Sequence, residues 1–318
     1  MAYAVEMINR RSDILPNVTL GYEIRNDCRE EDTTLWTTLT LADPCGDNTF
    51  QRHCPLHSRF NDQKTRTVVG IIGPGSSATS VFVTRAAAIY EVPTIAYSAS
   101  SDELSNIHHF PYFFRTVPPD RFQARVMIDL LLRYDWKHIA LYFSSDSYGS
   151  NGAEQILNLA EENGICIAIN TRIPKVGEKI EWDDIVLNLK TSPLISVAVL
   201  FSLSVPANSL IGAISEGNLG RRITFIGGDD LSGNDIIDAG YGYMLHGSLI
   251  VAPHSQVNTE FRQYWKDLED SNITTSPWYQ EFGDYWKDRH GCVDMASCLF
   301  PPVSESTVIN GYSRWRTL

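Results

Sequence analysis

The sequence lacks the long apolar segment that a membrane-spanning helix needs. Its most apolar stretch, Ile195 to Leu203, has the length of a β-strand, whereas a spanning helix requires about 18 or more apolar residues in a row. The opening residues, MAYAVEMINRRSD, contain no basic start followed by an apolar block, so they do not read as a signal peptide. Taken alone, these absences predict a soluble chain.

The motifs of common enzymes and metal sites are also missing. There is no GxSxG nucleophile elbow and no CxxC pair, and the eight histidines show no ligand spacing. His108 and His109 are adjacent in sequence, so their side chains point in different directions. We therefore expect no enzymatic activity, no metal and no cofactor.

Positive charge is scarce. The chain has 26 basic against 38 acidic residues, which gives a net charge of -12. Such a surface repels nucleic-acid phosphates and anionic lipids, so neither is an expected partner. With 318 residues, of which 43% are hydrophobic and 20% charged, the chain has the composition of a folded protein and enough length for two lobes.

Six cysteines are present: Cys28, Cys45, Cys54, Cys166, Cys292 and Cys298. Cys45 and Cys54 flank a polar loop, and Cys292 and Cys298 bracket a shorter one. Paired spacing of this kind fits disulfides and an oxidising compartment, although six ordinary thiols are the alternative.

Two glycosylation sequons point to the same compartment. They begin at Asn17 (Asn-Val-Thr) and Asn272 (Asn-Ile-Thr). A chain of this length also contains one or two such triplets by chance.

Strand and helix patterns alternate along the chain. Predicted strands are residues 17–25, 67–72, 92–97, 138–143, 165–169, 195–201, 223–226 and 247–251, and predicted helices are 76–91, 121–134, 149–163, 182–189 and 206–216. This alternation predicts an α/β fold in which parallel sheets are flanked by helices, and the number of strands suggests two such sheets.

Two loops rich in glycine and serine follow predicted strands. Residues 73–77 (GPGSS) open a helix, whose free N–H groups and partial positive charge suit a carboxylate or phosphate. The loop has no P-loop lysine and no complete GxGxxG, which makes a small carboxylate a better candidate than a nucleotide. Residues 97–101 (YSASS) add hydroxyls at the next strand end, so Ser77, Ser98 and Ser100 would converge. A tight turn and serine N-caps are the alternative.

Acidic and aromatic residues follow other predicted elements. Asp120 comes after two prolines and could pair with an ammonium or simply cap the helix that follows. Tyr148 follows the strand HIALYF and could offer an aromatic face to a cation, and Asp229 follows the strand ITFI. Both could equally lie in solvated turns. The serine loops could bind a carboxylate, and the acidic and aromatic residues could bind an ammonium. A ligand that carries both groups, a zwitterion, suits this combination.

These residues lie in stretches that resemble the Venus-flytrap ligand-binding domain of class C G-protein-coupled receptors, which include metabotropic glutamate, calcium-sensing, taste and vomeronasal type 2 receptors. The matching stretches are LPNVTLGYEIRNDC (15–28), VVGIIGPGSSA (68–78), VPTIAYSASSDELS (92–105), FFRTVPPDRFQARVMIDLLLRYDW (113–136), DSYGSNG (146–152), GICIA (164–168) and SPWYQEFGDYW (276–286). They cover most of the chain in the order of the family.

The resemblance implies a two-lobed type I periplasmic-binding-protein-like fold. Residues 1–117 plus 252–318 would form the first lobe, incomplete at both ends, and residues 118–251 the second. It implies that the ligand-binding residues are Ser77, Ser98, Ser100, Asp120, Tyr148 and Asp229. The three serines would hold an amino acid by its α-carboxylate or α-ammonium, Asp120 would hold the ammonium, and the last two would close over it.

Further expectations come from the same resemblance. Cys292 and Cys298 would form a disulfide, and Cys45 or Cys54 would lie where some members link two subunits. Asn234 stands where glutamate receptors have an arginine, which leaves the choice of amino acid open.

The expected function is therefore the extracellular ligand-binding region of a cell-membrane receptor that signals by lobe closure. The resemblance implies a homo- or heterodimer formed through the first lobe, with the helix Thr79 to Tyr90 either at the dimer surface or in the core. A G protein would be reached only through a transmembrane region outside this chain. The alternative is a soluble or channel-linked binding domain of the same fold.

Overall fold

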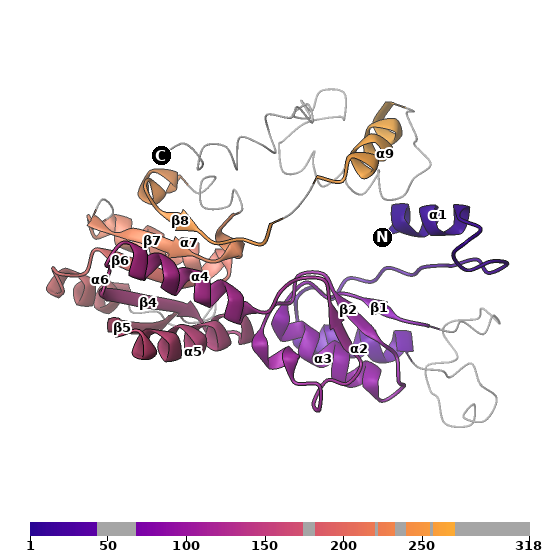
Figure 1. Ribbon diagram of the computed structural model, residues 1–318, viewed down its shortest axis with the longest axis horizontal. Helices are drawn as coiled ribbons and strands as arrows, with labels where there is room; N and C mark the ends of the chain where they lie inside the picture. Colours follow the sequence, from indigo (N-terminus) through magenta and orange to yellow (C-terminus); the bar gives the residue numbers. More distant parts are fainter. Residues whose placement is uncertain (43–67, 174–181, 220–221, 233–239, 255–256, 271–318) are drawn as a thin grey trace. The chain divides into compact units, whose positions relative to one another are not determined.

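The computed structural model describes residues 1–42, 68–173, 182–219, 222–232, 240–254 and 257–270 (Figure 1). Its contacts divide the chain into two compact units, Met1–Ile24 with His254–Leu318 and Arg25–Pro253. None of the described helices is both long enough and apolar enough to cross a membrane.

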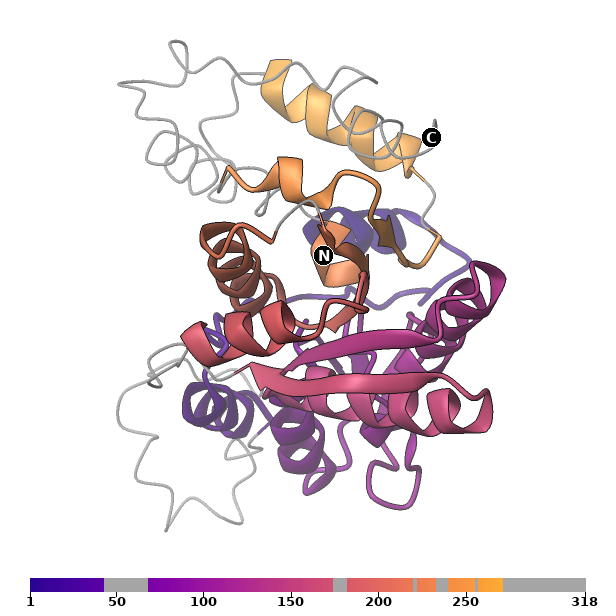
Figure 2. The same cartoon turned by 90° about the vertical axis from the view of Figure 1, so that its left-hand side faces the viewer.

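The larger unit contains two sheets, and all of their described strands are parallel. The second sheet has the order β5-β4-β6-β7-β8; its strands are labelled in Figure 1, and Figure 2 shows the same ribbon turned by 90°. They are β4 (His138–Ser144), β5 (Cys166–Ile173), β6 (Val197–Phe201), β7 (Thr224–Gly227) and β8 (Leu249–Ile250). Each of these strands was predicted to within a few residues.

Alternate residues of these strands point to opposite faces and build two separate cores. On one face Ala140 and Leu200 pack against α6 (Trp182–Thr191) and α7 (Ser204–Glu216). On the other face Ile139 and Val199 pack against α4 (Asp120–Arg133) and α5 (Ser147–Glu162). The central strand β6 is buried at every position, which explains why its sequence is an unbroken apolar run.

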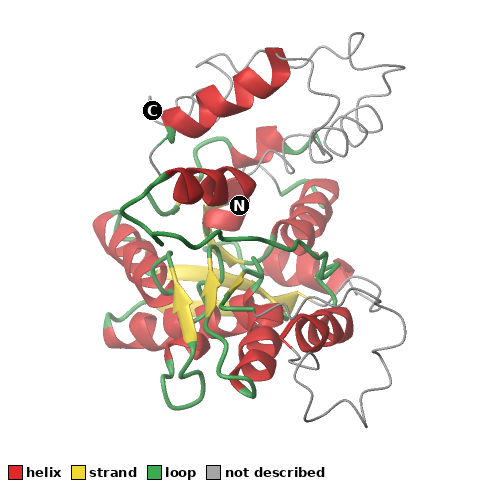
Figure 3. Cartoon of the chain, turned by 90° about the vertical axis from the view of Figure 1, so that its right-hand side faces the viewer, coloured by secondary structure: helices red, strands yellow, loops and turns green. Residues whose placement is uncertain are grey.

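The first sheet has the order β1-β2-β3. Its strands are β1 (Ile71–Ile72), β2 (Thr94–Ala96) and β3 (Phe113–Arg115), and Figure 3 shows both strands and helices by colour. Helix α3 (Ser77–Ala88) lies between β1 and β2 in the chain and packs through Ala87 against Val92. The predicted α/β class, with parallel sheets flanked by helices, is confirmed.

The smaller unit contains α1 (Ala2–Arg10) and α9 (Thr259–Asp270). Tyr3 of α1 meets two aromatic rings of α9, with ring-centroid distances of 5.5 Å to Phe261 and 4.8 Å to Tyr264. Its hydroxyl also donates to Glu260 at 3.4 Å. Ring contacts therefore join two helices that are far apart in the sequence.

The prediction of a strand at residues 17–25 is wrong. The segment has alternating apolar residues, but its backbone pairs with no strand in the described structure. Instead, the side-chain amide of Asn9 accepts from Leu20 N at 2.8 Å and donates to Leu20 O at 2.9 Å. The Val18 side chain is 59% exposed and therefore does not pack into a core. Alternation alone does not make a strand, because a strand also needs a hydrogen-bonded neighbour.

Two elements near the first sheet were not predicted, helix α2 (Glu31–Ala42) and strand β3. The α2 sequence is rich in threonine, which has low helix propensity, and it shows almost no amphipathic period. In the structure Thr34 and Thr38 are buried, and the Thr38 hydroxyl donates to Thr34 O at 2.8 Å. Packing against α3 therefore overrides local propensity.

Three short 3-10 helices lie among the described residues of the larger unit. They are η1 (Asp102–Ser105), η3 (Asp229–Ser232) and η4 (Gly242–Leu245). The first follows the serine-rich loop after β2, and the second follows β7, so both lie at strand ends where ligands of α/β folds bind.

Candidate functional site

The glycine-rich loop after β1 ends at the N-terminus of α3, as predicted. Gly73 has a φ of +108°, a conformation that side chains rarely adopt. Ser76 is the N-cap residue, and its side chain makes no capping hydrogen bond. The first N–H groups of α3 are therefore not satisfied by their own cap, which suits an anion. A Cβ on Gly75 would lie 3.3 Å from the Tyr97 ring, so that ring covers the loop.

The structure brings the two serine loops together. Ser77 Oγ accepts a hydrogen bond from Ser101 N at 3.1 Å, and both residues are buried. Ser100 joins the same cluster, since its carbonyl accepts from Asp120 N at 2.9 Å. Ser98 lies on this loop but is exposed. Three of the predicted residues, Ser77, Ser100 and Asp120, therefore form one continuous polar group.

Asp120 is the most unusual residue of this group. Its side chain is 2% exposed, and its Oδ2 atom has no hydrogen-bond partner among the described residues. Burial raises the pKa of Asp120 from 3.8 to about 7, opposed by a hydrogen bond from Ser100 and reinforced by the negative charge of Asp229. A buried carboxyl group with an unpaired oxygen and a raised pKa is a candidate partner for a cationic group.

Tyr148 and Asp229 form a second group at the ends of β4 and β7. The Tyr148 hydroxyl donates to Asp229 Oδ1 at 3.0 Å, and the Tyr148 ring packs on Phe201 with centroids 4.8 Å apart. Burial, together with the charge of Asp229, raises the pKa of Tyr148 well above its ordinary value. The phenol therefore stays protonated and acts as a donor at physiological pH.

The two groups meet at the N-terminus of α5. Ser147 Oγ donates to Glu103 Oε2 at 3.0 Å and lies 3.3 Å from Ser101 Oγ. The charges of Asp120 and Asp229 also act on each other, because Asp229 raises the pKa of Asp120. Polar atoms from the α3 loop and two carboxylates, Asp120 and Asp229, therefore belong to one connected polar region. This is the pattern that a zwitterion with an ammonium and a carboxylate would satisfy.

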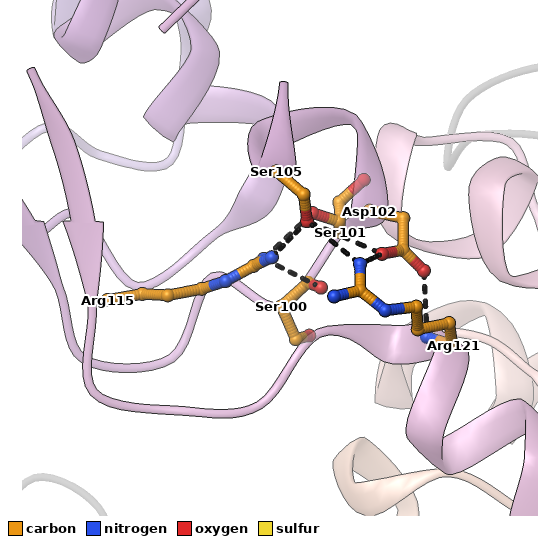
Figure 4. A network of polar contacts seen from close by, with 6 residues as sticks. All are labelled: Ser100, Ser101, Asp102, Ser105, Arg115 and Arg121. Atoms are coloured by element: carbon orange, nitrogen blue, oxygen red, sulfur yellow. Dashed lines mark hydrogen bonds and ion pairs between the residues drawn. The ribbon is translucent and has the colours of Figure 1, made fainter. Parts of the chain in front are cut away.

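Arg115, at the end of β3, holds the serine loop in place (Figure 4). Its Nη1 donates to Ser100 O at 3.0 Å and to Ser101 O at 2.9 Å, and its Nη2 donates to Ser105 Oγ. Arg115 was not predicted as a site residue. The sequence shows only that a basic residue follows two phenylalanines in a short strand. The planar guanidinium group of arginine holds several N–H donors in a fixed arrangement, which suits simultaneous hydrogen bonds to neighbouring carbonyl oxygens.

Asp102 ties η1 to the start of α4 in the same network (Figure 4). Its Oδ2 accepts from Arg121 N at 2.8 Å, and its Oδ1 accepts from Arg121 Nη1 at 2.6 Å. A carboxylate at a helix N-terminus stabilises the helix dipole. Asp102 therefore supplies the capping interaction for α4, whereas Asp120, the alternative N-cap from sequence, faces the polar group.

The other predicted sites lie on the surface or outside the described residues. Asn17 is exposed, with a φ of +63°. Asn272, Cys292 and Cys298 lie outside the described residues, as do Cys45, Cys54 and Asn234. Within the described part of the chain, Cys28 and Cys166 are exposed free thiols, and no cluster of histidine, cysteine and carboxylate side chains could hold a metal ion.

Parallel sheets with polar loops at their strand ends are the usual architecture of α/β ligand-binding proteins. Residues 1–285 match the family described as receptor family ligand binding region, and the chain belongs to this family. The family match places the chain among receptor binding domains rather than enzymes.

A similar protein is a metabotropic glutamate receptor of Drosophila melanogaster. It is 27% identical over 311 residues, which cover 96% of this chain and 32% of the relative. The chain thus spans about a third of the length of that protein. Together with the family match, this similarity confirms the resemblance to class C receptor ligand-binding domains and to their periplasmic-binding-protein-like fold.

Proposed function

We propose that this chain is the amino-acid-binding region of a class C receptor and that the ligand occupies the polar group around Asp120. The observation that carries the proposal is the buried Asp120 side chain, whose Oδ2 has no partner among the described residues. An α-ammonium would pair with Asp120 and Asp229. The α-carboxylate would meet the N-terminus of α3, Ser77 and Ser100, with Ser98 contributing to the ammonium through its carbonyl.

We propose the same lobe boundaries that the sequence suggested, residues 1–117 plus 252–318 for the first lobe and residues 118–251 for the second. In support, one face of the first sheet is apolar and exposed, with Ile72 and Phe114 each 56% accessible. A parallel sheet normally has both faces covered, so this lobe needs more chain than β1–β3, α2 and α3.

Signalling would follow from closure of the second lobe, through Tyr148 and Asp229, onto a ligand held by the first. A ligand shifts such an equilibrium only by its differential affinity for the closed state. The contacts of Ser147 with Ser101 and Glu103 supply polar interactions between the two sheets that would favour closure.

We also propose that the receptor dimerises through α3 of the first lobe. Val81, Phe82 and Ile89, on α3 and at its C-terminal end, line an apolar pocket with Leu35 of α2, and Ile89 is 72% exposed. The opposite side of α3, including Ala87, is core. Helix α3 thus has both a core face and a surface face suited to a partner subunit.

The placement at the extracellular side of the cell membrane is part of this proposal. It rests on the similarity to a metabotropic glutamate receptor. Glycosylation at Asn17 and Asn272 and a disulfide between Cys292 and Cys298 belong to the same proposal. Coupling to a G protein would require a transmembrane region, and none of the described helices forms one.

A panel of the natural amino acids tests the ligand class. We expect at least one of them to raise the melting temperature of the protein, since a ligand that binds only the folded state stabilises it. The N-acetyl and amide derivatives of that amino acid should have little effect, because each removes one charge of the zwitterion. The Ser100→Ala variant should bind about tenfold more weakly, the cost of roughly one hydrogen bond to a charged group.

Ser209→Ala serves as the control, because Ser209 is an exposed residue of α7. It should bind with wild-type affinity in the same titration calorimetry. Equal stabilisation by the amino acid and by its singly charged derivatives would contradict the proposal.

Ligand affinity should depend on pH through Asp120. Its pKa is raised from 3.8 to about 7, and only the ionised carboxylate pairs with an ammonium. We therefore expect affinity to rise with pH and to be about tenfold higher at pH 8 than at pH 6, following the ionised fraction. Calorimetry in buffers of different ionisation enthalpy should show a proton released on binding near pH 7.

The unliganded protein should show the opposite trend in stability. A raised carboxylate pKa means that the folded state binds more protons than the unfolded state between about pH 4 and pH 7. The contribution of Asp120 to the free energy of unfolding therefore falls as pH rises through this window.

For the affinity measurement, a binding constant that is flat from pH 6 to pH 8 would contradict ammonium pairing at Asp120.

A further inference from the structure

Gln123 connects the second half of the site to the main chain of the second sheet. It lies in the first turns of α4, and its side chain is only partly exposed. Its amide nitrogen donates to Val251 O at 2.9 Å and to Asp229 Oδ1 at 3.1 Å, and its Oε1 accepts from the Tyr148 hydroxyl at 3.2 Å. One side chain thus contacts both residues proposed to close over the ligand.

Chemistry allows only one orientation of this amide. The Val251 carbonyl and the Asp229 carboxylate are both acceptors, so the NH₂ group of Gln123 must face them. Its Oε1 then faces the Tyr148 hydroxyl. That hydroxyl has one proton and two acceptors, Gln123 Oε1 at 3.2 Å and Asp229 Oδ1 at 3.0 Å. The Tyr148 proton is consequently held on the side of these two residues.

The surrounding backbone leaves this network little room to rearrange. A Cβ on Gly228 would overlap the Tyr148 hydroxyl oxygen and lie 3.2 Å from Gln123 Oε1. Val251 is itself fixed, because its N–H donates to Gly227 O at 2.9 Å. One of the two acceptors of the Gln123 amide nitrogen is therefore fixed main chain directly after β8.

We propose that Gln123 is a positioning residue of the ligand site, which sets the direction of the Tyr148 hydroxyl and turns Oδ2 of Asp229 toward the ligand. Both described hydrogen bonds to Asp229 from this network end on Oδ1, so the carboxylate presents its other oxygen to an ammonium. This inference rests on the proposed roles of Tyr148 and Asp229. Gln123 itself needs no contact with the ligand.

Two variants with similar shape test the proposal by binding. Gln123→Met removes all three hydrogen bonds. It should lower the affinity for the amino acid that stabilises the wild type, and we expect a loss of about tenfold. Gln123→Glu should bind the amino acid more weakly still at pH 8, because an ionised Glu would face the Asp229 carboxylate. As the pH is lowered, protonation restores a donor, so the ratio of its dissociation constant to that of the wild type should shrink. A purely structural loss would leave that ratio constant.

Crystal structures of the unliganded wild type and of Gln123→Met separate this inference from the proposed function. We expect the Asp229 carboxylate and the Tyr148 hydroxyl to move in the variant. Unchanged positions would overturn the positioning role, whether or not any amino acid binds. If no amino acid binds the wild type, the proposed function fails, and the structures still decide the role of Gln123. Arg125→Met, an exposed change on the same helix, should alter neither the structure nor the affinity.

Discussion

Replacement of Asp120 by asparagine is expected to weaken amino-acid binding by about thirtyfold or more. Breaking a buried charge pair typically costs about 2 kcal/mol or more, which corresponds to that factor. The same change should leave the unliganded protein at least as stable as the wild type at pH 7.5. Burial raises the pKa of Asp120 to about 7, so the wild-type carboxylate is held charged at a cost that a neutral amide avoids.

Opposite effects on affinity and stability distinguish a ligand-binding carboxylate from a structural one. Titration calorimetry and denaturant unfolding on the same samples measure both quantities. Asp129→Asn is the matched control, because Asp129 lies on the same helix and its side chain is 62% exposed. Wild-type affinity in Asp120→Asn would refute the site, and a large loss of stability would indicate a structural role for this residue.

Replacement of Gly149 by alanine is expected to lower the free energy of unfolding by about 2 kcal/mol or more. A Cβ at this position would overlap Ser144 O and Ser144 Oγ and would lie 2.6 Å from Ser144 N. Overpacking of this kind costs roughly 1–3 kcal/mol, and occasionally more. The cost should lie at the upper end, because backbone atoms of β4 cannot rotate away, although the gain in helix propensity offsets up to about 1 kcal/mol.

The same substitution should reduce binding, because Tyr148 precedes Gly149 in α5. The N-cap bond from Gly149 N to Asp146 Oδ1, at 3.1 Å, would also be disturbed as the helix start moves. Ser150→Ala is the control, since Ser150 is the exposed next residue of the same helix, and surface changes usually stay within about 0.5 kcal/mol. Equal unfolding free energies for the two variants would show that α5 shifts without cost.

The contacts of the candidate site could be predicted in part. Parallel strands bring their carboxyl ends to one edge of a sheet, and this rule predicted that Ser77 and Ser100 converge. It did not place Asp120, which follows the unpredicted strand β3. The link between Tyr148 and Asp229 also needs the strand order, in which β4 and β7 are both neighbours of β6, and the sequence did not predict that order. Ser98 was included with them but lies exposed.

Other residues of the site could not be found in this way. Arg115 donates to the main-chain carbonyls of Ser100 and Ser101, and Gln123 donates to the Val251 carbonyl as well as to the Asp229 side chain. Every residue has a main-chain carbonyl, so the sequence does not indicate which one accepts a hydrogen bond. Gln123 and Val251 are also 128 residues apart. Such partners become visible only when the chain is folded.

The sequence by itself determined the alternation of strands and helices, the parallel sheets and most strand positions, because burial on both faces requires apolar runs that can be read directly. It also determined which loops carry serines and carboxylates. Only the tertiary structure decided that residues 17–25 form no strand and that the threonine-rich α2 is a helix, since pairing and packing partners come from distant parts of the chain. It alone decided the state of Asp120, because a raised pKa depends on burial and on the charge of Asp229, which local sequence does not contain.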